Sequence, residues 1–357
     1  MKRLAFLLPG SLERLTGGTI FDRRIVAGLR ATGWEAEVIS LATGFPWPDA
    51  AELETAAAAV AALPDGTLVV ADGLAFGAMP AIARQHAQRL RWVALVHHPL
   101  ALETGLDAHQ AQQLFESELQ ALACVRAVVV TSTATARALA SDYGVPSRCI
   151  HIVEPGVAPA ALSAGTPAGA KGQAVSLLCV ASLTPRKGHV LLLDALAGLR
   201  DRAWSLHCVG STTHDAATTA AVRAKIATLG LGKRVQLHGE RDAAALEAAY
   251  ARADAFVLAS FHEGYGMALS EALAHGLPVL STMSGAIPQT VPAGAGVLVP
   301  PGDPMALAAA LARLFDDPAW RATLALGARA VRQRLPDWPV AVARFARVLD
   351  ASSGAAP

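Results

Sequence analysis

Aromatic residues, cysteines and net charge are all scarce in this sequence. Phe, Trp and Tyr make up 5% of the 357 residues, and the formal net charge is +1. Neither property gives a reason to expect a nucleic-acid partner. The four cysteines form no Cys-x-x-Cys pair. We therefore interpret them as buried thiols of a protein in a reducing compartment.

Long apolar runs are also missing. No uninterrupted apolar segment reaches the roughly 20 residues that a membrane-spanning helix requires. Residues 4–8 follow a basic start but are too short an apolar run for a secretory signal, so they are interpreted as a first buried strand. From these two observations we expect a cytoplasmic protein.

Apolar residues nevertheless make up 53% of the chain, enough for two cores of ordinary domain size. Short β-rich segments alternate with Ala- and Leu-rich helical patterns, which is typical of doubly wound parallel α/β sheets. The expected strands form two series: 4–8, 35–41, 67–71, 92–97, 127–131 and 150–153, then 175–180, 205–209, 235–238, 253–258, 278–281 and 296–299.

The stretch 159–174 between the two series is rich in Ala, Gly, Pro and Ser, the composition of a linker. We accordingly expect domains at 1–160 and 161–335, with a final amphipathic helix in 336–357. Ligands of such sheets bind beyond the carboxyl ends of the strands, so two domains of this kind can form a cleft between them.

Residues 263–276 place two carboxylates and a glycine turn at one expected strand-to-helix junction. Gly264 and Gly266 allow a tight turn and close approach to a ligand, and free amides at a helix start suit a phosphate. Glu271 can accept both hydrogen bonds of a sugar diol, and Glu263 can meet another hydroxyl. Alternatively, Glu263 caps the helix and Glu271 is solvated. The chemistry alone does not decide between the two.

The spacing Glu263-x7-Glu271, with the residues around it from 260 to 279, resembles the Glu-x7-Glu motif of glycosyltransferase family 4. The resemblance implies the GT-B fold, in which two Rossmann-like domains face a cleft, and retaining transfer of a sugar from a nucleotide-sugar donor. By this resemblance, Glu271 holds the nucleotide ribose and Glu263 contacts the donor sugar as a catalytic residue. The segment facing the sugar or diphosphate comprises Gly264, Tyr265, Gly266, Met267 and Ala268.

Arg186 and Lys187 follow the expected strand 175–180, at a predicted helix start. The helix dipole disfavours cations there, and a bound anion would resolve the conflict. Together a guanidinium and an ammonium suit a diphosphate. Two solvated loop cations are the alternative. The phosphate clamp that family members carry at this place favours the functional interpretation.

The first domain's candidates rest mainly on the resemblance. Gly17 and Gly18 lie between the first strand and a helix pattern, where family members carry a loop that approaches the donor phosphates or the acceptor. His97 and His98 end a strand, where a family histidine contacts the donor sugar. We choose His98 as the catalytic residue, with two structural histidines as the alternative. By the resemblance, the final helix returns to the first domain.

Gly210 and Arg241 lie in loops that follow two strands of the second domain, where backbone groups can recognise a nucleobase. At residues 154–157 the chain has Glu-Pro-Gly-Val, where family members often have Asn-Gly-x-Asp. The basic segment 82–91 fits either a contact with anionic lipid at the inner membrane face or a solvated helix face, and we favour the solvated face.

No Asp-x-Asp motif, the usual metal clamp of the other large transferase fold, occurs in the chain. We therefore expect a metal-independent hexosyltransferase without a cofactor, whose donor is a substrate. Its acceptor would be a sugar, a lipid-linked molecule or a small molecule, in glycan, glycolipid or glycosylated-metabolite synthesis. The alternatives are a nucleotide-sugar epimerase and a catalytically silent sugar-nucleotide-binding protein.

Overall fold

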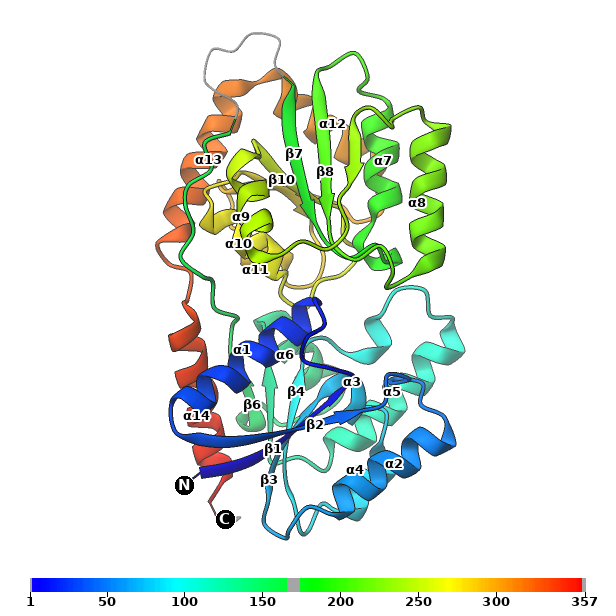
Figure 1. Cartoon of the computed structure of the whole chain (residues 1–357), viewed down its shortest axis with the longest axis vertical. Helices are drawn as coiled ribbons and strands as arrows, with labels where there is room; N and C mark the ends of the chain where they lie inside the picture. Colours follow the sequence, from blue (N-terminus) through cyan, green and yellow to red (C-terminus); the bar gives the residue numbers. More distant parts are fainter. Residues whose placement is uncertain (1, 166–173, 355–357) are drawn as a thin grey trace. The chain divides into compact units, whose positions relative to one another are not determined.

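The computed structural model describes residues 2–165 and 174–354 (Figure 1). The chain forms two compact units. Unit 1 contains the residues up to Gly156 and those after Leu335, and unit 2 runs from Val157 to Leu335. Each unit holds one parallel sheet, and within the described residues each sheet has six strands.

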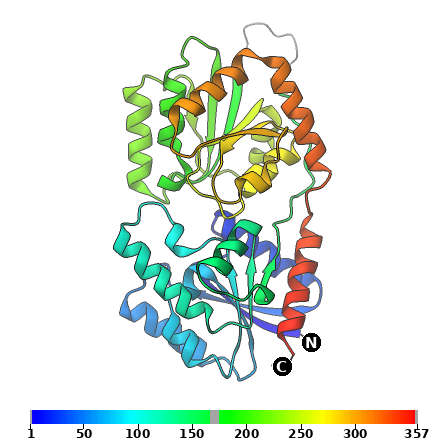
Figure 2. The same cartoon turned by 180° about the vertical axis from the view of Figure 1, so that it is seen from behind.

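Unit 1 has the strand order β2-β1-β3-β4-β5-β6. Its inner strands are largely buried, apart from Lys2 and Arg3, because helices cover both faces of the sheet (Figures 1 and 2). The strands are β1 Lys2–Pro9, β2 Trp34–Leu41, β3 Leu68–Asp72, β4 Arg91–Val96, β5 Ala127–Val130 and β6 Ile150–Ile152, and the α-helices are α1 Gly17–Ala31, α2 Ala50–Ala61, α3 Gly73–Phe76, α4 Pro80–Gln85, α5 Ala108–Leu122, α6 Thr133–Ser141 and α14 Trp338–Ser352.

Unit 2 has the strand order β12-β11-β10-β7-β8-β9. Because β7 lies between β10 and β8, the loops that follow these three strands meet at one edge of the sheet. The strands are β7 Val175–Val180, β8 Trp204–Val209, β9 Val235–Leu237, β10 Ala255–Leu258, β11 Val279–Thr282 and β12 Gly296–Val299, and the α-helices are α7 His189–Ala197, α8 Ala216–Thr228, α9 Ala243–Arg252, α10 Met267–Ala274, α11 Ile287–Thr290, α12 Pro304–Asp316 and α13 Pro318–Arg332.

The two series of predicted strands correspond to these two sheets, so the predicted α/β fold class is confirmed. The last helix, α14, packs on α1 in unit 1. Its Phe345 ring lies 6.5 Å from that of Phe21, and a Cβ atom at Gly28 would lie 2.3 Å from a methyl carbon of Val342.

Three local expectations differ from the structure. Gly17 and Gly18 are not a loop but the first residues of α1, because the hydroxyl of Thr16 caps that helix. The described part of the expected linker is attached to unit 2, where Ser163 Oγ donates to the carbonyl of Ala253 at 2.7 Å. The rest of that linker, 166–173, lies outside the described residues.

The third difference concerns the basic segment 82–91, which is not one helix. Helix α4 ends at Gln85, and β4 begins at Arg91. The guanidinium of Arg89 donates to the carbonyl of Val60 at 2.8 Å, and Arg91 donates to that of Ser353 at 2.5 Å. These cations therefore tie unit 1 together. Among the described residues, no helix is both long and apolar enough to cross a membrane.

Candidate active site

The loop after β7 carries the two predicted phosphate-binding cations. Arg186 and Lys187 lie in a short 3-10 turn, Pro185–Lys187, rather than in the first turn of a helix, and α7 begins after Gly188. Gly188 has a φ of 65°, and a Cβ atom there would lie 2.0 Å from the carbonyl oxygen of Ala259. Only glycine fits this close approach. The clamp loop is thereby held against the end of β10.

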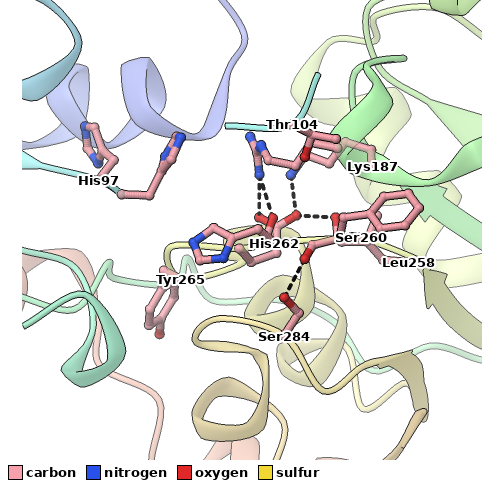
Figure 3. A network of polar contacts seen from close by, with 12 residues as sticks. His97, Thr104, Lys187, Leu258, Ser260, His262, Tyr265 and Ser284 are labelled. Atoms are coloured by element: carbon pink, nitrogen blue, oxygen red, sulfur yellow. Dashed lines mark hydrogen bonds and ion pairs between the residues drawn. The ribbon is translucent and has the colours of Figure 1, made fainter. Parts of the chain in front are cut away.

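The same two cations surround the buried carboxylate of Glu263. Lys187 Nζ lies 2.6 Å from Glu263 Oε1, and Arg186 Nη1 lies 3.6 Å from Oε2. Ser260 Oγ donates to Oε1 at 2.5 Å (Figure 3). Arg186 also donates to the carbonyl of His262 at 2.8 Å. The structure thus joins two predictions made separately, the phosphate clamp and the first glutamate of the motif.

The pKa values in this cluster follow from burial and charge. Burial by itself would raise the pKa of Glu263, but the charges of Lys187 and Arg186, with hydrogen bonds from Lys187 and Ser260, lower it to about 2. Burial lowers the pKa of Lys187, and the Glu263 carboxylate opposes that change. The two ends of the pair differ because the carboxylate has two cations beside it, whereas the ammonium faces one carboxylate and one cation. Glu263 is therefore ionised at neutral pH.

The turn after Glu263 leads into α10. Gly266 precedes this helix with a φ of 86°, in the left-handed region that favours glycine, and no side chain caps the helix start among the described residues. The loop after β11 supports the turn, because the amide of Ala286 donates to the carbonyl of Glu263 at 2.9 Å. Ser284 Oγ donates to the carbonyl of Phe261 at 2.5 Å (Figure 3).

Glu271 has a partner that the sequence did not reveal. The hydroxyl of Tyr250, on α9, donates to Glu271 Oε2 at 2.9 Å, and the tyrosine is 2% exposed. Its ring stacks on His275 at 4.5 Å with an interplanar angle of 8°. Burial and the neighbouring Glu271 carboxylate raise the pKa of Tyr250 well above its usual value. Tyr250 is therefore a neutral donor that orients the second glutamate.

The predicted nucleobase loops lie on the same edge of the sheet of unit 2. The amide of Gly210 donates to the carbonyl of Gly239 at 3.0 Å, which joins the loops after β8 and β9. A Cβ atom at Gly210 would lie 2.2 Å from the carbonyl oxygen of Ala181, at the end of β7. Arg241 is exposed just before α9. The loops are close together. Glycine is required at position 210 for packing, because there is no space for a side chain there.

In unit 1 two buried carboxylates lie against His97, the histidine that we did not choose. His97 Nε2 lies 3.1 Å from Asp22 Oδ1 and 3.5 Å from Asp72 Oδ2. Burial would lower the pKa of His97, but these carboxylates raise it to about 10. Burial raises the pKa of Asp22 to about 7 against the opposing effect of His97. No motif marked Asp22 or Asp72.

His98 contacts a different partner. Its Nε2 lies 3.2 Å from Glu103 Oε2, and both side chains are partly exposed. Gly18 belongs to the His97 cluster, because a Cβ atom there would lie 3.1 Å from the His97 ring. Around Gly17, by contrast, a Cβ atom would meet nothing within 4 Å among the described residues. The two glycines of the predicted pair therefore differ in their surroundings.

Known proteins resemble this chain in sequence and in fold. Residues 174–317 match the family model of glycosyl transferases group 1. A D-inositol 3-phosphate glycosyltransferase of Thermobispora bispora is 32% identical over 285 residues, which cover 72% of this chain and 65% of the relative. The protein of that name from Corynebacterium glutamicum is 36% identical over 39% of this chain and 34% of its own length. The chain thus spans between about a third and two thirds of these curated relatives.

Solved structures share the fold at low sequence identity. Sucrose-phosphate synthase from Thermosynechococcus elongatus has a TM-score of 0.83 at 22% identity, over 98% of this chain and 99% of that chain. Anabaena HepE in complex with UDP and glucose has a TM-score of 0.77 at 19% identity, over 98% and 100%. Residues 174–317 therefore form a domain of the group 1 glycosyl transferases, and the chain has the GT-B fold.

Proposed function

We propose that this protein is a retaining, metal-independent glycosyltransferase of family 4 that transfers a hexose from a nucleoside-diphosphate sugar to an acceptor hydroxyl. One observation carries the proposal: Arg186, Lys187 and Glu263 form a buried cluster where the loops after β7 and β10 meet. Two cations and one carboxylate give these three side chains a combined charge of +1. Such a cluster at the carboxyl edge of a parallel sheet suits an anionic ligand.

The donor diphosphate is the anion that fits these groups. An ammonium and a guanidinium together can neutralise charge that develops on the leaving phosphate, and electrostatic stabilisation of this kind is a major source of rate. The start of α10 adds backbone amides and the positive end of the helix dipole. In this proposal Tyr265, Met267 and Ala268 belong to the segment that faces the donor.

Glu263 acts as an ionised hydrogen-bond acceptor. With a pKa of about 2 it carries no proton to donate at neutral pH, so it is not a general acid. Its first role is to hold two cations side by side at a buried position, where they would otherwise repel each other. Its second is to accept hydrogen bonds from hydroxyls of the donor sugar, within reach of the phosphate clamp.

Glu271 binds the ribose. A carboxylate offers about four acceptor positions, so one oxygen can hold the Tyr250 hydroxyl while the group accepts hydrogen bonds from a diol. Tyr250 is fixed by burial and by stacking on His275. The Glu271 carboxylate is therefore oriented before the nucleotide binds, which lowers the entropic cost of binding.

Unit 1 carries a histidine and two glycines to which the family resemblance gives a role. We assign the sugar contact to His98 and a positioning role to His97, because the two side chains are equally exposed, at 20%, but the ring of His97 is held by the buried Asp22 and Asp72. Gly18 allows α1 to pack on the His97 ring. Gly17 has open space around its backbone, which suits the approach of a phosphate or an acceptor.

The donor is found by thermal shift with UDP, GDP, ADP and TDP sugars, followed by an assay of slow donor hydrolysis. A donor at a hundred times its dissociation constant adds about 2.7 kcal/mol of stability, which gives a measurable shift. Lys187→Ala and Glu271→Ala should each abolish the shift, whereas the exposed Lys233→Ala should retain it. Inositol 3-phosphate is an acceptor to test, because relatives of this chain carry its name.

Each alternative predicts its own result. A silent binding protein gives a shift without turnover, and an epimerase converts the donor sugar without releasing the nucleotide. Hydrolysis that requires added Mg²⁺ or Mn²⁺ would contradict metal independence. An inverted anomeric centre in the product would contradict retention. If no nucleotide sugar shifts the melting temperature, the assigned donor site is wrong.

A further inference from the structure

A second cluster lies in the core of unit 2, beside the loop that carries Arg186 and Lys187. It consists of Cys179 on β7, Cys208 on β8 and His189, the first residue of α7. The three residues are 1%, 3% and 4% exposed. Their ligand atoms all lie within 4.8 Å of one another, and Cys179 Sγ is 3.7 Å from His189 Nε2. Two sulfur atoms and an imidazole nitrogen are thus gathered at one buried point.

The fold, not a sequence motif, brings these residues together. Cys179 and Cys208 are direct partners in the register of the parallel strands β7 and β8. His189 reaches them because the left-handed Gly188 ends the clamp loop and starts α7 above the sheet. This arrangement has no Cys-x-x-Cys spacing, so cysteine counting does not detect it.

The distances suit a tetrahedral metal ion. Zn²⁺ binds cysteine sulfur at about 2.3 Å and histidine nitrogen at about 2.0 Å, which places a sulfur and a nitrogen of one tetrahedron about 3.6 Å apart. The 3.7 Å between Cys179 Sγ and His189 Nε2 agrees with that separation. Two thiolates and a neutral imidazole also balance a divalent charge, so the loaded site buries no net charge.

The contacts of His189 show which ring nitrogen faces the sulfur atoms. Nε2 lies 3.7 Å from the Cys179 sulfur, and a thiol is a weak hydrogen-bond partner. Nδ1 is buried and finds no hydrogen-bond partner in the part of the chain that the structure describes. Nε2 is therefore the nitrogen that can bind a metal ion, with the ring proton on Nδ1.

We propose that Cys179, His189 and Cys208 form a structural site for a soft divalent cation, with Zn²⁺ as the natural candidate. The ion ties together β7, β8 and the start of α7. Since His189 directly follows Lys187 and Gly188, the ion also fixes the end of the clamp loop. Water can fill the fourth tetrahedral position. The site takes no part in the transfer chemistry, so its test is independent of the donor and acceptor.

The first experiment measures metal content. The full chain is produced with a tag that contains no histidine, in medium supplemented with zinc, and purified under reducing conditions without chelator. We expect about one Zn²⁺ per chain by elemental analysis, because a buried site of this ligand set retains its ion. Protein produced with Co²⁺ instead should show the thiolate-to-cobalt charge-transfer band and the visible bands of a tetrahedral ion.

Variants assign the ion to these residues. Cys208→Ser and His189→Gln should each lose the metal and the cobalt spectrum, and Cys124→Ser, at a partly exposed cysteine of unit 1, should keep both. Circular dichroism checks that each variant is folded. If Cys208→Ser does not fold, His189→Gln still tests the assignment, because it changes no sulfur atom.

Three results would overturn the proposal. The first is wild-type protein that is purified from zinc-rich medium without metal and remains spectroscopically silent with Co²⁺. The second is metal that is present but equally retained by His189→Gln and Cys208→Ser. The third is a disulfide between Cys179 and Cys208, found by mass spectrometry in protein purified under reducing conditions, because the neighbouring thiols then form a covalent bond rather than a metal site.

Discussion

Replacing Glu263 by Gln tests the charge cluster directly, because Gln keeps the shape of the side chain and removes its charge. The pKa of Glu263 is about 2 in the folded protein, against an ordinary value of 4.5. This difference corresponds to about 3 kcal/mol of folding stability. Burial lowers the pKa of Lys187 even beside Glu263, so the ammonium offsets part of that gain. We expect Glu263→Gln to cost unit 2 about 2 to 3 kcal/mol near pH 7.

The dependence on pH distinguishes a charge effect from a packing effect. A carboxyl group whose pKa is lowered on folding contributes its full stability above the unfolded pKa, and loses it as the pH falls toward the folded value. The wild-type advantage over Glu263→Gln should therefore be complete above about pH 4.5 and fall to about 1 kcal/mol near pH 3. A loss caused only by altered packing would be the same at both pH values.

Urea unfolding near pH 7 and near pH 3 measures this difference, with a separate transition fitted for each unit. The exposed Glu240→Gln is the matched control and should leave unit 2 unchanged. A Glu263→Gln variant as stable as wild type near pH 7, or equally destabilised at both pH values, would refute the assigned ion pair.

Three further changes test the surroundings of the site. Tyr250→Phe removes the donor to Glu271 and should weaken donor binding about tenfold in calorimetric titration, the effect of about 1.4 kcal/mol; unchanged affinity would contradict its orienting role. Because folding raises the pKa of His97, the free energy of unfolding of wild-type unit 1 should fall as the pH rises from about 6.5 to about 10. His97→Gln should abolish this pH dependence in urea unfolding. Gly188→Ala should cost more than about 2 kcal/mol in urea unfolding because its Cβ would overlap the Ala259 carbonyl, and a smaller loss would mean that the loop can move.

The strands were predictable because parallel sheets covered on both faces need short, nearly continuous apolar runs. Errors occurred at strand ends, where side chains decide. The predicted segment 253–258 begins two residues before β10, because Ala253 ends α9 and the Asp254 carboxylate accepts the amide of Ser176 at 2.8 Å. At Gly17 the prediction of a loop failed for a similar reason, since a threonine cap starts the helix earlier than its apolar pattern does.

The candidate site was predictable only where one segment carries it. Glu263 and Glu271 lie in one short loop-and-helix segment, and Arg186 and Lys187 lie in one turn, so their spacing could be recognised in the sequence. The contact between Lys187 and Glu263 joins positions 76 residues apart and exists because β7 and β10 are neighbours in the sheet. Nothing local marks Tyr250, which lies in an Ala-rich helix, or the carboxylates around His97.

The choice between two adjacent histidines shows why such contacts need the fold. Side chains at consecutive positions near a strand end point in different directions, so one of His97 and His98 turns toward α1 and β3 and the other does not. Only the fold shows that Asp22 and Asp72 lie on the side of His97. Two buried carboxylates need a nearby cation, which makes His97 a fixed anchor. Its neighbour His98 is just as exposed but lies beside the exposed Glu103 instead, which is why we propose His98, rather than His97, as the contact with a ligand.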